Sequence, residues 1–356
     1  MLQMYLKSIF LRVLSCSLIV TARPTKRNAT APVYESSQPP KIDSNSVQGD
    51  KDYKEPYFPI LNWTQYEKNP ILEPNQARGW ESSYVYNPTA MVIDDMVVLL
   101  YRAQNSSLIS TLGLAWSTDG YNFTRYTEPI FYPTESYENK GTEDPRLVRI
   151  NGTFYMTYTG YSDSDGVKLC MATSTDLLNW NKTGPILPEI GHSKSGAILD
   201  EIQPDGTYHM HFGEGKLYVA TSTDLIHWKA TTNTTYATGI FDWEKLLIES
   251  GPPPVKTRDG QWLKVYNGVS AQTKGDYVLG QYSTGQMLIS PTLFPYGPPV
   301  ARLETPVLTP NTGDEKKGQV NNVLFSEGWV QFRGQWLMYF GEADTRLGVA
   351  YAPVQP

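Results

Sequence analysis

One phrase occurs three times in this chain and restricts the possible folds more than any other feature. The copies are LAWSTDGYNF from residue 114, MATSTDLLNW from residue 171 and VATSTDLIHW from residue 219. Their shared aspartates, Asp119, Asp176 and Asp224, are 57 and 48 residues apart (176−119 and 224−176). Such spacings are close to the periods of about 40 to 50 residues that are typical of propeller blades. The sequence therefore predicts a fold built from repeated units.

Each copy has the pattern of a strand that ends in a Ser/Thr-Asp turn, whose side chains bond the local backbone. The aromatic residue that follows is expected to pack between units. Short alternating strands lie between the copies, such as residues 154–159 and 208–212, or after the last one, such as 336–340, and no long amphipathic helix is predicted. A region of roughly 300 residues divided into blades of about 60 gives five. We therefore predict an all-β fold, a five-bladed β-propeller.

The N-terminal residues 1–22 are expected to be a signal peptide. Two basic residues, Lys7 and Arg12, precede the apolar run 13–20, and small residues follow it. Seven Asn-x-Ser/Thr sequons agree with secretion: Asn28, Asn62, Asn105, Asn122, Asn151, Asn181 and Asn233. The run is shorter than the roughly 20 residues that span a bilayer, so a signal anchor in the secretory pathway is the weaker alternative and no stable membrane span is expected.

Residues 23–55 are rich in Pro, Ser, Lys, Asp and Asn, which is typical of a flexible low-complexity stalk. Residues 56–356 then form the predicted propeller domain. Cys16 lies in the expected leader and Cys170 is the one other cysteine, so no disulfide framework supports the fold. The net charge of −6 argues against nucleic acid as the main partner.

The segment GTEDPRL, residues 141–147, is the strongest candidate for chemistry. It places two carboxylates, Glu143 and Asp144, and the guanidinium of Arg146 around Pro145. Proline fixes its own φ and favours an extended backbone at the preceding residue, which is Asp144 here. The alternative is a surface turn with weak ion pairs.

A propeller brings the inner strands of its blades around one axis, so polar residues inside otherwise apolar strands are expected to converge on one pocket. The candidates are Asn87, Arg102, Asp144, Lys194, Glu214, Glu249, Asn267 and Asp344. For any single member, a turn or cap whose hydrogen bonds are satisfied is an equal alternative.

Several of these segments together resemble glycoside hydrolase family 130, the mannoside phosphorylases and mannosidases with a five-bladed β-propeller. The matching motifs are NPTA from residue 87, YRA from 101, GTEDPRL from 141, KSGAI from 194, GPPP from 251, GQVNNVLFSEG from 318 and MYFGEAD from 338. The resemblance implies a mannose-containing oligosaccharide or glycan as the partner.

The resemblance also implies roles for individual residues. Asp144 matches the general acid of the family, which acts through a sugar hydroxyl. Asn87, Arg102 and Arg146 are expected to bind the sugar or an anion. Further substrate-binding residues are expected at Glu143, Lys194, Asn267 and Asp344.

Family members use either phosphate or water to attack the sugar. This chain has Asn267 where the phosphorylases show a histidine, and Glu214 near the position of an expected arginine. Because a carboxylate repels phosphate, these departures predict that water is the nucleophile. We therefore expect a secreted hydrolase that cleaves β-mannosidic linkages, with β-1,2 linkages expected, and inverts the configuration at the anomeric carbon. Glu214 or Glu249 would activate the water. A phosphorylase and a non-catalytic carbohydrate-binding propeller are the alternatives.

No cofactor and no catalytic metal is predicted. His209 and His211 alternate onto one face of a strand, but no acidic ligands with metal-binding spacing lie nearby in the sequence.

Overall fold

The computed structural model describes residues 34–231, 235–293 and 297–356. The expected signal peptide, the first part of the predicted stalk and the sequons at Asn28 and Asn233 lie outside the described residues. Among the described residues, no helix has the length and apolar character needed to cross a membrane.

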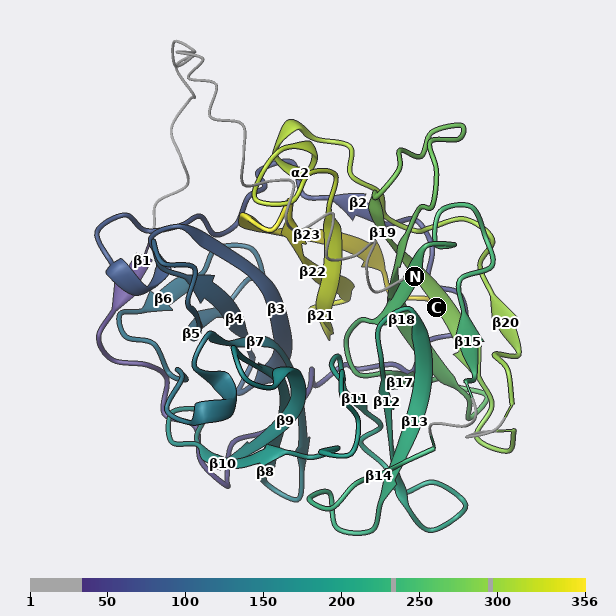
Figure 1. The fold of residues 1–356 in the computed structure, drawn as a ribbon, viewed down its shortest axis with the longest axis horizontal. Coiled ribbons are helices and arrows are strands. Elements are labelled where there is room, and N and C mark those ends of the chain that lie inside the picture. Colours follow the sequence, from purple (N-terminus) through teal and green to yellow (C-terminus); the bar gives the residue numbers. More distant parts are fainter. Residues whose placement is uncertain (1–33, 232–234, 294–296) are drawn as a thin grey trace. The chain divides into compact units, whose positions relative to one another are not determined.

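The fold is all-β, as predicted, and its strands form four hydrogen-bonded sheets that follow one another around the molecule in chain order (Figure 1). The largest sheet contains β1 (Tyr34–Ser36), β3 (Tyr84–Ile93), β4 (Met96–Gln104), β5 (Ser110–Ser117), β6 (Thr124–Tyr126), β7 (Gly141–Ile150), β8 (Thr153–Ser162), β9 (Gly166–Ser174) and β10 (Asn181–Pro185). It consists of two groups of strands. The first contains β1 and β3 to β6, and the second contains β7 to β10. One residue pair, Ser110 with Gly141, joins the two groups.

Two five-stranded sheets come next along the chain. The first contains β11 (Ala197–Ile198), β12 (Tyr208–Phe212), β13 (Lys216–Ser222), β14 (Lys229–Ala230) and β15 (Ala237–Thr238). The second contains β16 (Leu247–Ser250), β17 (Val255–Lys256), β18 (Trp262–Val269), β19 (Tyr282–Ile289) and β20 (Ala301–Arg302).

The last sheet joins both ends of the described chain. It contains β2 (Thr64–Gln65), β21 (Leu324–Phe332), β22 (Gln335–Glu342) and β23 (Arg346–Pro353), and β2 pairs with β23. The described helices are short: the 3-10 helices η1 (Gly79–Glu81) and η2 (Ser136–Glu138), and α2 (Gly313–Lys316).

Three of the longest hairpins close with the same kind of turn. β3 and β4 are joined by Asp94 and Asp95, β7 and β8 by Asn151 and Gly152, and β21 and β22 by Arg333 and Gly334; both residues of each pair have positive φ. Two central residues with positive φ form a type I′ turn, whose twist matches that of antiparallel strands. The turns therefore fix the register of the strands that carry the site.

The repeated phrase forms the turn that the sequence predicts. The third strand of three groups ends at Ser117, Ser174 and Ser222, and each hydroxyl donates to the aspartate two residues later. The following aromatic residue packs in the core: Trp228 is buried, and Trp180 is packed against the cluster that contains Phe131 and Tyr158. The repeat is thus a structural element and carries no site residue.

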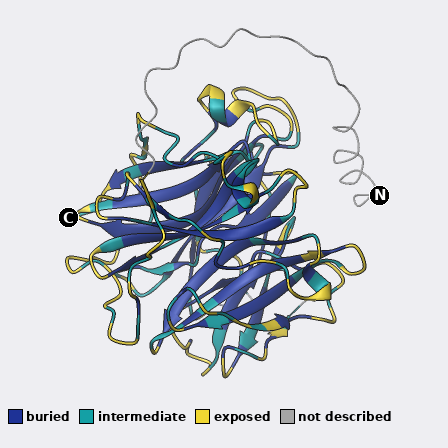
Figure 2. Cartoon of the chain, turned by 90° about the vertical axis from the view of Figure 1, so that its left-hand side faces the viewer, coloured by how far each residue is buried: buried dark blue, intermediate teal, exposed yellow. Residues whose placement is uncertain are grey.

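The apolar cores lie between neighbouring groups of strands. One cluster joins Val85 and Leu99 to Leu337 and Val349, which come from opposite ends of the described chain. Figure 2 shows the result, with largely buried strands inside and exposed residues mainly in loops and at strand ends. Close packing between sheets, in place of disulfides, holds the strand ends of different groups close together.

The predicted stalk requires a correction, because residues 34–55 pack along the sheets. β1 pairs in parallel with β6, and Ile42 is buried in a core cluster. The guanidinium of Arg149 donates to the carbonyls of Asp43 and Ser46. The amino-acid composition did not predict this packing, because the segment is held by its backbone groups and by the single apolar side chain of Ile42 rather than by an apolar surface.

Candidate active site

Three strands, β3, β7 and β21, contain the same kind of irregularity at the same place relative to their hairpin partner. The register shifts between Tyr86 and Pro88, between Glu143 and Arg146, and between Ser326 and Gly328. The residues in these bulges include Asn87, Asp144 and Glu327. A bulge adds a residue to one strand and turns its side chain in a new direction. The bulges therefore bring three polar side chains together from three separate strands.

Asp144 does not have the extended backbone that Pro145 was expected to favour. Its φ is +53°, and that of Asn87 is +48°. The Nδ2 of Asn87 donates to the Oδ1 of Asp144 at 2.6 Å. This hydrogen bond fixes the side chains of the two residues relative to one another. Left-handed backbone at a residue other than glycine is uncommon and often occurs at functional sites.

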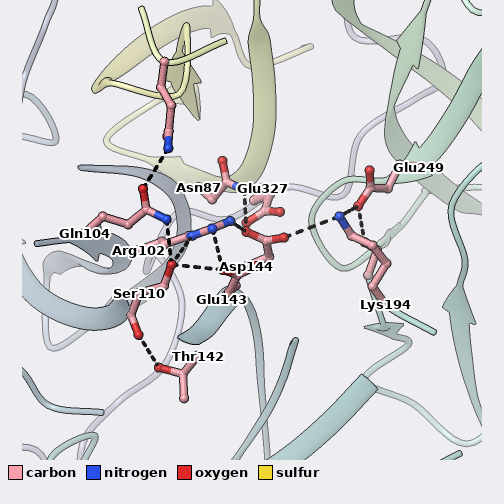
Figure 3. Close-up of polar contacts among 12 residues, drawn as sticks. Asn87, Arg102, Gln104, Ser110, Thr142, Glu143, Asp144, Lys194, Glu249 and Glu327 are labelled. Carbon is pink, nitrogen blue, oxygen red and sulfur yellow. Dashed lines mark hydrogen bonds and ion pairs between the residues drawn. The ribbon is translucent and has the colours of Figure 1, made fainter. Parts of the chain in front are cut away.

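The Asp144 carboxylate lies at the centre of a cationic cluster (Figure 3). Nη1 of Arg102 donates to its Oδ1 at 2.9 Å, and Nζ of Lys194 lies 3.6 Å from its Oδ2. Burial raises the pKa of Asp144, but Arg102, Lys194, Arg146 and the bond from Asn87 outweigh burial and hold the pKa below its usual range. The Asp144 side chain is therefore an ionised carboxylate near neutral pH.

Arg102 positions both acidic residues of the EDPR segment. Its Nη2 donates to Glu143 at 2.5 Å, its Nε donates to Ser110 at 2.9 Å, and its guanidinium carbon lies 4.6 Å above the ring of Tyr86. Burial raises the pKa of Glu143 despite Arg102. Glu143 thus lies behind Arg102 and fixes its orientation.

Lys194 joins Asp144 to the two glutamates that the sequence singled out. Its Nζ lies 3.1 Å from Glu249 and 3.8 Å from Glu214. Ser195 donates its hydroxyl to Glu249, and His192 lies 2.8 Å from Glu214. One lysine therefore serves three carboxylates.

The pKa values of the two glutamates shift in opposite directions because their surroundings differ. For Glu214, burial raises the pKa, but Lys194 and His192 outweigh it and lower the pKa to about 2. For Glu249, which is 2% exposed, burial dominates and raises the pKa in spite of Lys194. Glu214 is thus a carboxylate that its neighbours stabilise.

Asp344 supplies a further carboxyl group from the turn after β22. It is half-buried, has a φ of +50°, and makes no side-chain hydrogen bond or ion pair to the described part of the chain. Burial raises its pKa to about 7, against the attraction of Arg102 and with the repulsion of Asp144. Asp344 can therefore gain or lose a proton near neutral pH.

Two predicted substrate ligands are used inside the protein instead. Arg146 is 2% exposed; it donates to the carbonyls of Gly251 at 2.9 Å and Ser250 at 2.6 Å, and pairs with Glu327 at 2.9 Å. Asn267 is fully buried and exchanges hydrogen bonds with the backbone of Ser326. Their polar groups bridge neighbouring strands, which polar residues in buried strands often do.

The structure adds four residues that the sequence analysis did not single out: Ser110, His192, Ser195 and Glu327. Glu327 had a signal, since it is a charged residue inside the apolar strand LFSEGWVQF. The other three are small or polar residues in unremarkable segments, and their roles depend on contacts from other strands.

The two histidines that alternate on β12 each bond a nearby side chain. His209 Nε2 lies 2.8 Å from Asp205, and His211 Nδ1 lies 2.9 Å from the hydroxyl of Tyr236. Within residues 34–231, 235–293 and 297–356, no group of three or more His, Cys, Asp or Glu side chains is arranged to hold a metal ion.

This chain is similar to known proteins over nearly the full length of those proteins. A 1,2-β-oligomannan phosphorylase of Thermoanaerobacter sp. (strain X514) is 34% identical over 82% of this chain and 97% of its own. A β-1,2-mannobiose phosphorylase of the same strain is 32% identical over the same shares.

A solved structure gives the same result at the level of the fold. It comes from work on the GH130 family of mannoside phosphorylases and its glycoside hydrolases that target β-1,2 mannosidic linkages in Candida mannan. It superposes with a TM-score of 0.75 at 31% identity and covers 85% of this chain and 99% of that chain. The family profile described as β-1,4-mannooligosaccharide phosphorylase matches residues 62–356. With this match, and with the site residues on the motifs that suggested it, the chain belongs to glycoside hydrolase family 130.

Proposed function

We propose that the protein is a β-mannoside phosphorylase that acts on β-1,2-linked mannose units. The observation that carries the proposal is the 34% identity to a 1,2-β-oligomannan phosphorylase over 97% of that enzyme. The cluster of Arg102 and Lys194 around Asp144 adds two cations at the site where a phosphate would enter.

The prediction of hydrolysis is wrong, because the four relatives found by sequence comparison are phosphorylases. The prediction relied on Glu214 as a free negative charge that repels phosphate. Instead, Glu214 lies 3.8 Å from Nζ of Lys194 and 2.8 Å from Nε2 of His192, so its charge is not isolated. The assignment of Glu214 and Glu249 as water-activating bases falls with it, and both residues are better described as groups that hold Lys194 in place.

The reaction requires a bond to form and a bond to break at the anomeric carbon. A phosphate oxygen bonds to that carbon on the face opposite the leaving group, and the bond to the leaving oxygen breaks. Asp144 gives a proton to that oxygen, directly or through a sugar hydroxyl. The products are an α-mannose 1-phosphate and a shortened mannoside.

Asp144 needs a proton before it can act as the acid, since Arg102 and Lys194 hold its pKa below the usual range. Monobasic phosphate brings this proton and transfers it to Asp144. Phosphate beside Arg102 and Lys194 also offsets the positive charge that lowers the pKa of Asp144. After the leaving oxygen takes the proton, Asp144 is again a carboxylate, and the overall charge is unchanged.

The strand groups support a five-bladed arrangement as part of this proposal. The nine-stranded sheet divides at the single pair Ser110 with Gly141 into two groups. These two groups and the other three sheets make five units of four or five strands, which is the size of a propeller blade.

Product analysis tests the proposed function. The protein is incubated with β-1,2-mannobiose or β-1,4-mannobiose, with and without inorganic phosphate. We expect α-mannose 1-phosphate from the β-1,2 disaccharide, and only when phosphate is present. Free mannose formed without phosphate would contradict the proposal, and no turnover of either sugar would favour a non-catalytic carbohydrate-binding protein.

Substitution of Lys194 by methionine is expected to raise the KM for phosphate by about 30- to 100-fold, the effect of losing a charged contact. The change removes a cation that faces three carboxylates. Steady-state kinetics with varied phosphate measures it. Lys216→Met, an exposed lysine on β13, is the matched control and should leave the KM unchanged. An unaltered KM in Lys194→Met would remove Lys194 from the phosphate site.

Affinity for oxyanions is expected to fall as the pH rises through 7. Asp344, whose pKa is about 7, becomes negative over this range, among Arg102, Asp144, Lys194 and Glu249. Sulfate, which does not titrate here, serves as a competitive inhibitor, and its affinity should drop by roughly tenfold between pH 6 and pH 8.5. Asp344→Asn should remove this dependence. A similar slope in the variant would exclude Asp344 as its source.

A further inference from the structure

The strands that present the candidate active site also form the wall of a second cavity. Thr89–Val92 follow Asn87 on β3, Leu147–Arg149 follow Asp144 on β7, and Trp329–Gln331 follow Glu327 on β21. A strand advances by about 3.3 Å per residue, so residues three positions further on lie roughly 10 Å along it. The second cavity is therefore at the other end of the same strands.

Buried polar contacts separate the two ends. Arg146 lies on β7 between Asp144 and Leu147, and its guanidinium bonds the carbonyls of Ser250 and Gly251 and pairs with Glu327. Arg146 and Glu327 are 2% and 0% exposed. The two sites are therefore distinct.

The cavity has a volume of about 390 Å³ and is open to solvent. Three aromatic residues line it, Tyr53, Trp329 and Trp336; the rings of Trp329 and Trp336 are 5.1 Å apart, and Tyr53 meets Trp336 edge-on at 6.1 Å. Tyr53 is 43% exposed, whereas Trp329 and Trp336 are 6% and 1% exposed, so Tyr53 is the ring that a ligand can reach. Ligand pockets commonly have volumes of about 300 to 1,000 Å³.

Polar groups around the aromatic cluster are not fully used within the described residues. The indole N–H of Trp336 and the Nε of Arg149 have no hydrogen-bond partner there, although both side chains are buried. The exposed carboxylate of Asp200 also lines the cavity. Native proteins rarely leave buried donors unpaired, so these two groups need partners such as ordered water.

Part of the wall comes from the segment that was predicted to be a stalk. Gln48, Asp50, Tyr53 and Glu55 line the cavity. The segment is fixed in place, because the side chain of Gln331 bonds both backbone groups of Lys54. These residues precede the family match, which begins at residue 62. The cavity is therefore a feature that this chain builds with residues beyond the family domain.

We propose that this cavity is a second carbohydrate-binding site, which takes a neutral hexose unit of an oligosaccharide. An aromatic ring such as that of Tyr53 stacks on the apolar face of a sugar, and the exposed carboxylate of Asp200 can accept hydrogen bonds from its hydroxyl groups. Four acidic residues line the cavity, Asp50, Glu55, Asp200 and Glu201, against Arg149 and Lys256, so an anionic ligand is disfavoured. The statement that the sugar is a mannoside rests on the proposed function. The proposal that the cavity binds a sugar does not depend on that function.

Calorimetry on the full chain tests the proposal. In Asp144→Asn protein, which keeps both sites but should not turn over, β-1,2-mannotetraose is expected to bind with a stoichiometry of two. Adding Tyr53→Ala or Asp200→Asn should reduce the stoichiometry to one. Tyr57→Ala is the matched control, since Tyr57 is exposed on the same segment but does not line the cavity.

Turnover separates this proposal from the proposed function. Tyr53→Ala in the otherwise unchanged protein should cleave mannobiose at the normal rate, while its binding of the tetraose at the second site is lost. The protein could bind a neutral oligosaccharide of mannose, glucose or galactose in a Tyr53-dependent way and yet show no phosphorolysis. That result would support the second site and contradict the proposed phosphorylase function. If Tyr53→Ala and Asp200→Asn alter the binding of none of these sugars, the second site is excluded.

Discussion

Replacement of Asp144 by asparagine is expected to reduce kcat for phosphorolysis of β-1,2-mannobiose by about 10²- to 10⁴-fold, the range found for loss of a general acid. The amide oxygen still accepts the bonds that Asn87 and Arg102 donate to Oδ1, so the site keeps its shape. What the variant lacks is a group that can carry the proton to the leaving oxygen. Steady-state rates in both directions, from mannobiose with phosphate and from mannose 1-phosphate, should fall together.

The neighbouring glutamate provides a matched control. Glu143 also bonds Arg102, and Glu143→Gln keeps an oxygen for that bond. Because Glu143 lies behind Arg102, its substitution should change kcat much less than the substitution of Asp144. If Asp144→Asn keeps most of its activity, or if Glu143→Gln loses more, the proton donor has been assigned to the wrong carboxyl group.

Substitution of Arg146 by leucine is expected to lower the free energy of unfolding by about 3 to 5 kcal/mol, the usual effect of removing one partner of a buried ion pair. The change leaves Glu327 buried without a cation and removes donors from two backbone carbonyls. Urea unfolding of the purified protein measures the loss. By contrast, Arg333→Leu breaks an exposed pair with Asp95 and should cost less than about 1 kcal/mol.

The pH dependence of this loss has a definite sign. Burial raises the pKa of Glu327 well above its usual value, and Arg146 opposes the rise. Without Arg146, folded protein holds a proton on Glu327 that unfolded protein releases, so stability is greatest at low pH and falls as the pH rises. The parent protein already holds Glu327 at a raised pKa, so the gap between Arg146→Leu and the parent protein should widen only as the pH rises through that raised pKa. A constant gap would mean that Glu327 is not the group left unpaired.

The sequence was sufficient for the family, because motifs such as GTEDPRL carry several fixed residue types in order. The role of Asp144 as the acid stays a prediction. The sequence was misleading on the nucleophile. Glu214 was judged as an isolated charge, whereas His192 and Lys194 lie beside it in the folded protein. The effect of a charged residue depends on its neighbours in space, which a linear pattern does not name.

Local features were determined by the sequence itself. The Ser-x-Asp turns and the two-residue hairpins depend on hydrogen bonds and backbone angles within a few residues, so their residue types predict them. Only the tertiary structure decided the use of Arg146 and Asn267 as links between strands, the docking of residues 34–55 and the cavity that this segment completes. Lys54 and Gln331, for example, are 277 positions apart. Such contacts form because packing brings distant strands together, and neither composition nor periodicity records which ones will meet.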